Sequence, residues 1–113
     1  MLFRSSATSV SNLDPLKQLT QLQRLHLSRA SNVSDLSSLK NLTQLQELDV
    51  SYTAAANLEP LRHLTQLQSL NLRGAMALDL SPLAQMEVIT VYLDRRQVKL
   101  PETLRDRVKR WSD

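Results

Sequence analysis

The sequence contains no cysteine, a single glycine (Gly74) and few aromatic residues, which make up 4% of its 113 residues. The lack of cysteine excludes disulfides, thiolate metal sites and cysteine nucleophiles. One glycine is too few for a glycine-rich phosphate-binding loop. Because aromatic side chains are scarce, leucine has to provide most of the core within a hydrophobic fraction of 42%.

The sequence also lacks a long hydrophobic run. No stretch approaches the roughly 18 consecutive apolar residues of a membrane-spanning helix. The N-terminal segment MLFRSSATSVSN has only one basic residue and no extended apolar stretch, so it does not resemble a secretory signal peptide. We therefore expect a protein that is cytoplasmic or delivered without a classical signal peptide.

Positive charge is concentrated near the C-terminus. Residues 1–94 contain seven Lys or Arg and eight Asp or Glu, a net charge of −1, whereas residues 95–113 contain seven and three, a net charge of +4. This change in composition predicts a separate C-terminal element. Its candidate basic patch consists of Arg105, Arg107, Lys109 and Arg110.

The pentapeptide LTQLQ occurs three times, at residues 19–23, 42–46 and 64–68. The copies begin 23 and 22 residues apart, a period typical of stacked repeat architectures. The flanking residues repeat as well, giving four units that begin at Leu13, Leu36, Leu58 and Leu80. The fourth unit is the least regular, as expected of a terminal repeat.

Each unit switches between two hydrophobic periods. In the second unit the apolar positions are Leu36, Leu39, Leu42, Leu45, Leu48 and Val50. A spacing of three favours a 3₁₀ or tight helical segment, and a spacing of two favours a strand. Proline follows an acidic or cap-forming residue in Asp14-Pro15, Glu59-Pro60 and Ser81-Pro82, which predicts the start of the helical segment. Stacked units of this kind would align their strands in a parallel sheet.

This pattern resembles the leucine-rich repeat, whose motif is L-x-x-L-x-L-x-x-N/C-x-L. The matching residues are Leu22-Leu25-Leu27, Leu45-Leu48-Val50, Leu67-Leu70-Leu72 and Val88-Val91-Leu93. The 22-residue unit with its L-x-P-L start is most similar to the bacterial internalin-like subclass. The resemblance implies an α/β fold, a short leucine-rich-repeat solenoid with a parallel sheet on the concave side and 3₁₀ or short helical arcs on the convex side.

The chain departs from the family at the ninth motif position, which is usually asparagine. That position holds Ala30, Thr53, Ala75 and Arg96. In the family, the asparagine hydrogen-bonds backbone groups where each strand ends, which alanine cannot do. We expect looser return turns, whose backbone groups pair with water or with one another, most of all at Ala54-Ala55-Ala56.

An open stack exposes its core at both ends, so caps are expected. Near the C-terminus, one face of a helix starting at Pro101 would contain Leu100, Leu104, Val108 and Trp111. We therefore predict an N-terminal cap or partly disordered segment at residues 1–12, about four repeats at residues 13–94, and a basic C-terminal cap with a capping helix at residues 95–113. An extra half repeat is a further alternative for residues 1–12.

The resemblance implies that residues between the strand leucines point outward on the concave face, where members of the family usually bind partners. Three columns result: Arg24, Glu47, Ser69 and Thr90; His26, Asp49, Asn71 and Tyr92; and Ser28, Ser51, Arg73 and Asp94. The candidate partner-binding residues are Arg24, His26, Glu47, Asp49, Asn71, Arg73, Tyr92 and Asp94, with Tyr52 as a second aromatic anchor.

Opposite charges are neighbours in these columns at Arg24–Glu47, His26–Asp49 and Arg73–Asp94. Parallel strands lie about 4.8 Å apart, so such neighbours can form ion pairs. Two interpretations stay open. The pairs either satisfy one another on the surface, contributing about 0–1 kcal/mol each, or belong to a mixed-charge recognition surface.

His26, Asp49 and a serine at 28 or 51 contain the chemical groups of a hydrolase triad. A flat sheet face offers neither a strained nucleophile turn nor an oxyanion hole, so no catalytic residue is assigned. The other histidine, His63, falls on the convex side, and no acidic calcium loop is present. The sequence therefore predicts neither a metal nor a cofactor.

These observations favour a non-enzymatic, monomeric module that binds an unidentified protein through its concave face. One alternative is binding to an anionic surface, nucleic acid or acidic lipid, through the basic C-terminal helix. Nucleic acid is not favoured because the apolar face of that helix is needed as a lid. A second alternative is a regulatory repeat segment of a larger bacterial effector or signalling protein.

Overall fold

The computed structural model describes residues 2–4, 12–77, 79–86, 89–94 and 108–110 of the chain. In chain order, its elements are β1 (Leu2–Arg4), η1 (Asp14–Leu16), β2 (Arg24–His26), η2 (Ser37–Leu39), β3 (Glu47–Asp49), η3 (Glu59–Leu61), β4 (Ser69–Asn71), η4 (Ser81–Leu83), β5 (Thr90–Leu93) and β6 (Val108–Arg110). Each η element is a single turn of 3₁₀ helix. In this part of the chain, no helix is long and apolar enough to cross a membrane.

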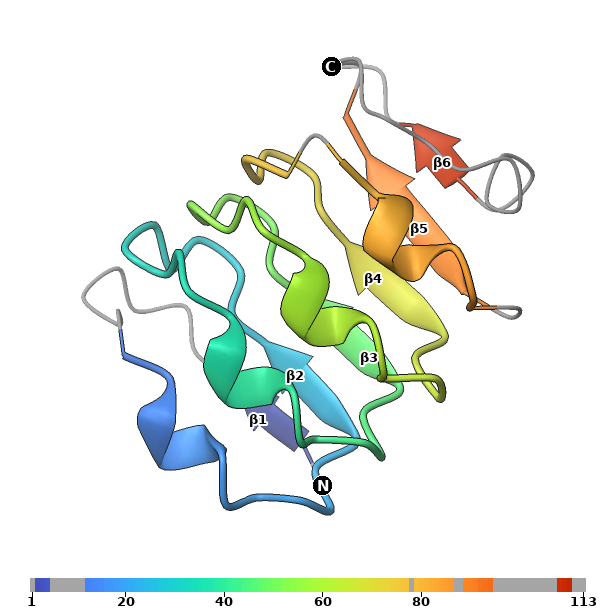
Figure 1. Cartoon of the computed structure of the whole chain (residues 1–113). Coiled ribbons are helices and arrows are strands. Elements are labelled where there is room, and N and C mark those ends of the chain that lie inside the picture. The colour runs from blue at the N-terminus through green and yellow to red at the C-terminus, as the bar shows by residue number, and fades with distance from the viewer. Residues whose placement is uncertain (1, 5–11, 78, 87–88, 95–107, 111–113) are drawn as a thin grey trace.

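The strands form one parallel sheet in which the spatial order follows the chain order, from β1 to β6. Figure 1 shows the strands stacked in one row and the 3₁₀ helices in a second row that covers one side of the sheet. The register is constant along the stack, with Leu25 opposite Leu48, Leu48 opposite Leu70 and Leu70 opposite Val91. The predicted solenoid of strands and 3₁₀ arcs is confirmed by this arrangement.

The core lies between these two rows and is built mainly of leucine. Leu48 at the centre of β3 has no exposed surface, and the same holds for Leu39 on η2 and Leu61 on η3. A 3₁₀ turn eclipses side chains three residues apart, which explains the leucine spacing of three before each strand. Successive repeats thus place equivalent leucines in direct contact, and the stack buries what a single repeat would leave exposed.

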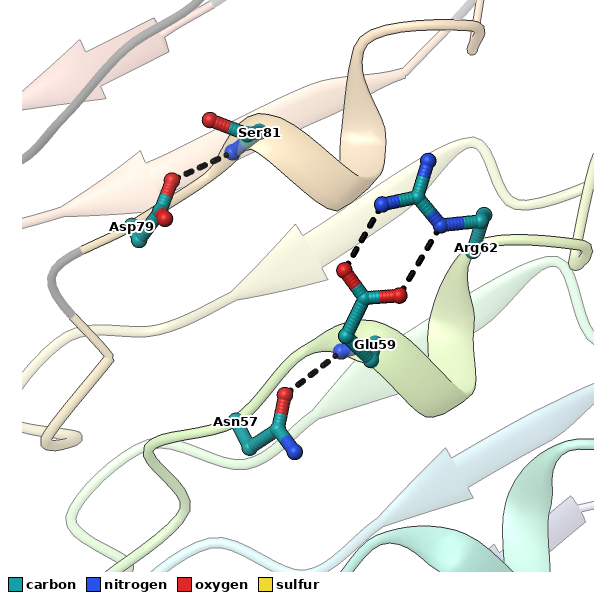
Figure 2. A network of polar contacts seen from close by, with 5 residues as sticks. All are labelled: Asn57, Glu59, Arg62, Asp79 and Ser81. Carbon is teal, nitrogen blue, oxygen red and sulfur yellow. Dashed lines mark hydrogen bonds and ion pairs between the residues drawn. The ribbon is translucent and has the colours of Figure 1, made fainter.

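Each 3₁₀ turn is preceded by a side chain that bonds its first backbone N–H. The acceptors are Asn12, Asp35, Asn57 and Asp79, whose Oδ1 atoms lie 2.9–3.0 Å from the N–H of Asp14, Ser37, Glu59 and Ser81, respectively. Figure 2 shows the two bonds at Asn57 and Asp79. The acidic or hydroxyl residue before each proline therefore does not accept this bond but donates it from its own backbone.

The return turns after the strands are linked mainly through their backbones. Ala54 N donates to Val33 O at 2.9 Å, and Met76 N donates to Ala55 O at 3.0 Å. Ala30, Thr53 and Ala75 are all buried. The turn at Ala54-Ala55-Ala56, expected to be the loosest, is thus bonded to the repeats on both sides of it. Arg96, the fourth residue of this motif position, lies outside the described residues.

Both ends of the sheet carry a strand beyond the four repeats. β1 pairs in parallel with β2, so part of the expected N-terminal cap continues the sheet, as the half-repeat alternative implies. At the C-terminus, β6 pairs with β5, with Val91 opposite Val108. The predicted capping helix is therefore wrong at residues 108–110, where backbone pairing with a neighbouring strand prevails over the helical spacing of apolar residues. The rest of that helix lies outside the described residues.

Candidate functional site

The parallel register places the predicted columns on one face of the sheet. Arg24, Glu47, Ser69 and Thr90 form one column, and His26, Asp49, Asn71 and Tyr92 form the next. Between them run the buried residues Leu25, Leu48, Leu70 and Val91. Alternation along a strand sends neighbouring side chains to opposite faces, so the buried leucines fix the outward direction of both columns. Of the eight outward residues, all but the exposed Arg24 are half-buried.

A side-chain hydrogen bond crosses this face diagonally from β2 to β3. The Nε2 atom of His26 contacts the Oε2 atom of Glu47, and their side chains are 22% and 41% exposed. The expected neighbours of His26 and Glu47 were Asp49 and Arg24, which lie opposite them in register. In the described residues, neither expected pair forms. Register fixes Cα neighbours, whereas the longer Glu47 side chain can reach the diagonal position.

Asp49 makes its hydrogen bonds to its own strand exit. Its Oδ1 atom accepts from Ser51 N at 2.9 Å and from Ser51 Oγ at 2.6 Å. The Oγ atoms of Ser51 and Ser28 are also within hydrogen-bond distance, at 3.1 Å. The serine hydroxyl is therefore bonded to Asp49 and to the next serine, and His26 pairs with a different carboxylate. The three groups are not arranged as a nucleophile, a base and an orienting acid.

The same local bond recurs one repeat further on. Asn71 Oδ1 accepts from Arg73 N at 3.1 Å, as Asp49 does from Ser51. Asp94 Oδ2 accepts from Gly74 N at 3.0 Å and so connects the fourth repeat to the strand exit of the third. These short carboxyl and amide side chains hold the backbone where the strands end, which keeps the outward columns in register.

A shallow hollow of about 350 Å³ lies at the centre of the face. It is lined by His26, Glu47, Leu48, Asp49, Ser69, Asn71 and Tyr92. Five of the eight predicted binding residues therefore meet around one depression. The other three, Arg24, Arg73 and Asp94, do not line it.

Tyr52 and Arg29 form a second feature, at the strand exits. Tyr52 was predicted as an aromatic anchor of the concave face, but it lies in the turn after β3, where it is 38% exposed. Arg29 Cζ lies 4.7 Å from the centroid of the Tyr52 ring, a cation–π contact. The sequence analysis did not identify Arg29. The signal was present, because residues 29, 52 and 74 occupy one repeat position.

β6, at the end of the same sheet, contains part of the predicted basic patch, and its Lys109 lies opposite Tyr92 in register. Of the basic patch, Lys109 and Arg110 belong to β6, whereas Arg105 and Arg107 lie outside the described residues. Within the part of the chain that the structure describes, no group of three or more His, Cys, Asp or Glu side chains is placed to hold a metal ion.

Two solved structures show what this chain is similar to. The crystal structure of internalin C2 from Listeria monocytogenes superimposes with a TM-score of 0.79 at 27% sequence identity, over 89% of this chain. The crystal structure of the internalin InlF from the same species gives a TM-score of 0.65 at 26% identity, over 83% of this chain. No protein-family model and no curated protein matches the sequence.

The similarity extends to the architecture of the repeat. The parallel sheet and the 3₁₀ turns are typical of the leucine-rich repeats of internalins, which are generally protein-binding and non-enzymatic. The chain spans 47% of the length of internalin C2 and 34% of that of InlF. It therefore corresponds to part of each of those proteins.

Proposed function

We propose that this chain, a leucine-rich repeat protein similar in structure to the internalins, is a non-enzymatic module that binds a protein partner through its concave sheet face. The observation that carries the proposal is the central hollow. Residues from four consecutive strands meet there, and they offer two carboxylates, an imidazole, an amide and a tyrosine on one open surface. Such a mixed polar and aromatic surface is typical of protein recognition.

The difference between the constant inward positions and the variable outward positions of the strands supports this proposal. The inward position of the strands is Leu25, Leu48, Leu70 and Val91, while the outward position beside it changes from His26 to Asp49, Asn71 and Tyr92. The frame is thus nearly constant, and the exposed chemistry differs at each step. A surface that only solubilises the sheet would not need such differences in size and charge, whereas a surface that recognises one partner does.

The size of the face indicates how far the partner must extend. Six strands at about 4.8 Å and three residues of about 3.3 Å each give a flat area of roughly 24 by 10 Å. A standard interface buries about 800 Å² on each partner. The partner would therefore also contact the strand exits, where Tyr52 and Met76 are exposed by 38% and 60%.

The alternative function, binding to an anionic surface, was based on a basic C-terminal helix that residues 108–110 do not form. The basic patch was expected on an amphipathic helix, but Lys109 and Arg110 lie on an edge strand. Residues 108–110 form a strand, whereas interfacial binding to a membrane of the expected kind uses an amphipathic helix. We therefore rank this function, and that of a regulatory repeat segment, below protein binding by the concave face.

Affinity capture followed by mass spectrometry tests the proposal. The wild type is compared with Glu47→Ala/Asp49→Ala/Tyr92→Ala, after circular dichroism has shown that the variant is folded. The matched control is Gln21→Ala/Gln44→Ala/Gln66→Ala, three exposed positions of the repeated pentapeptide. Lysates of producing cells and of eukaryotic cells serve as sources. A protein captured by the wild type and the control, but lost with the concave-face variant, is the expected result.

A further variant distinguishes binding by the concave face from binding by the basic patch. In this variant, glutamine replaces Arg105, Arg107, Lys109 and Arg110. If capture depends on these four residues and not on the concave face, the function lies in the basic patch. If no protein is enriched from either lysate, protein binding by this chain is not supported.

A further inference from the structure

The central hollow has unused hydrogen-bond acceptors. Glu47 contacts His26 through Oε2, and no hydrogen bond from the described residues reaches its Oε1. Asp49 accepts both bonds from Ser51 through Oδ1, which leaves Oδ2 without a protein donor in the same part of the chain. Both side chains are half-buried and both line the hollow. Two carboxylate oxygens of residues that line the hollow therefore accept no hydrogen bond from the described residues.

Acidic side chains outnumber basic ones among the described residues that line the central hollow. Among the described residues that line it are two carboxylates, Glu47 and Asp49, and no lysine or arginine. Even if the ring of His26 is protonated, it balances only one of the two. Arg24 and Arg73 of the columns are not among the lining residues, and the backbone of Lys109 on β6 lies opposite Tyr92 in register. The described lining thus carries more acidic than basic groups, which favours a positively charged group.

Tyr92 adds an aromatic surface to this negative site. It lies on β5, in the same column as Asp49 and Asn71, and it borders the hollow. Cations bind favourably over the face of a tyrosine ring. The chain already shows this preference at the strand exits, where the guanidinium group of Arg29 lies 4.7 Å from the ring centroid of Tyr52.

From these features we infer that the hollow receives the guanidinium group of an arginine side chain on the partner protein. Glu47 and Asp49 accept its N–H groups, and Tyr92 provides a ring for it to stack on. The inference rests on the proposed function and specifies the chemistry of its partner. A guanidinium group is planar, has five donors and stacks on aromatic rings, whereas the ammonium group of lysine is a compact, strongly hydrated point charge with three donors and no planar face.

Other occupants fit this lining less well. An anionic side chain would face two carboxylates. A metal ion would need a group of at least three ligands, which is not found among the described residues. An apolar side chain would cover half-buried carboxylates without providing donors, which carries a desolvation cost.

The test uses three short peptides and isotope-labelled protein. Acetyl-Gly-Ser-Arg-Ser-Gly-amide, and the same peptide with lysine or citrulline at the centre, are titrated into the protein while backbone amide shifts are followed by NMR. We expect the arginine peptide to shift amides of β3, β4 and β5, the lysine peptide to bind more weakly, and the citrulline peptide, which has no charge, to have no effect there.

Two variants locate the contact. Glu47→Gln and Asp49→Asn each remove one carboxylate, and each is expected to weaken binding of the arginine peptide by about tenfold, as for the loss of a charge-assisted hydrogen bond. Asp49→Asn should preserve the turn, because Asn71 makes the equivalent bond one repeat further on. Glu59→Gln is the matched control, since it removes the same charge from the convex side, where Glu59 is exposed.

The outcomes separate this inference from the proposed function. Equal shifts with arginine and citrulline, unchanged affinity in both hollow variants, or no shift on the concave face would each overturn the guanidinium inference. If a captured protein still depends on the concave face, the proposed function stands without it. If the arginine peptide binds in the hollow but no protein is captured, the proposed function fails and the guanidinium site remains.

Discussion

The ring of Tyr52 packs so closely against Gly74 that a Cβ atom on this glycine would lie 2.5 Å from Tyr52 Cδ1. The two residues occupy the same position in consecutive repeats, and both have positive φ, 56° for Tyr52 and 70° for Gly74. Arg29, one repeat earlier, also has positive φ, at 66°, and its guanidinium group contacts the same ring. The only glycine of the chain thus makes room for a tyrosine from the neighbouring repeat.

Gly74→Ala is therefore expected to destabilise the protein. The added methyl group meets the ring, and alanine is strained at this φ, so we expect a loss of about 1–3 kcal/mol in the free energy of unfolding. Chemical denaturation of the single variant and of Tyr52→Ala/Gly74→Ala measures this. Removing the ring should recover the part of the loss that is due to the clash. A single variant as stable as the wild type would contradict the close packing.

Leu48→Ala tests the register of the whole stack. Leu48 is completely buried at the centre of β3, and replacing such a leucine with alanine costs about 2–5 kcal/mol. We expect a large drop in melting temperature, measured by circular dichroism. Leu19→Ala is the comparison, because Leu19 is only partly buried against the core and should cost less. If both variants had the same melting temperature, the assignment of Leu48 to an inward position would be wrong.

The arrangement of strands and 3₁₀ turns could be predicted because it follows from the spacing of the leucines and from the length of the repeat. The geometry of 3₁₀ turns and strands imposes a leucine spacing of three, then two. From the sequence, Leu39 could therefore be assigned to a 3₁₀ arc of the convex side and Leu48 to a strand of the concave sheet. The repeat period then set the register. Neither inference required knowledge of any particular side-chain contact.

Polar contacts could be predicted less well, because they depend on side-chain reach. Repeat alignment placed Asp49 opposite His26, but the histidine pairs with Glu47, whose longer side chain spans the diagonal. The residue that bonds the start of each 3₁₀ turn was assigned two positions too late, even though Asn57 and its equivalents recur with the repeat. Helical spacing misassigned Val108, because pairing with β5 is a long-range effect that a local pattern does not contain.

Thr53→Val tests how the chain compensates for the missing asparagine ladder. Thr53 is 4% exposed. Its hydroxyl donates to Val50 O at 2.7 Å and accepts from Ala55 N at 3.3 Å. Valine has the same shape but leaves both backbone groups without these bonds, so we expect a loss of about 1–3 kcal/mol. Denaturant unfolding measures it, with Thr65→Val as the control at an exposed threonine. Equal stability of the two variants would argue against this role.

The convex side offers a test that depends on pH. Asp35 accepts two hydrogen bonds from Ser37, from Oγ at 2.5 Å and from N at 2.9 Å, and these bonds, the side-chain one first, lower the pKa of its carboxyl group. Because the folded pKa lies below the unfolded value of about 3.9, this stabilisation is complete above that pH and is lost as the pH falls through the folded pKa.

Ser37→Ala removes the larger of the two causes. The pKa of Asp35 should therefore rise toward its ordinary value while remaining below it, since the backbone bond is kept. Carboxyl carbon shifts in an NMR titration report this pKa directly. Ser38→Ala is the matched control, because the Ser38 hydroxyl bonds Asp14 at 2.6 Å and does not bond Asp35. A rise in the pKa of Asp35 in the Ser38 variant, or its absence in the Ser37 variant, would show that the hydroxyl of Ser37 does not hold the carboxylate.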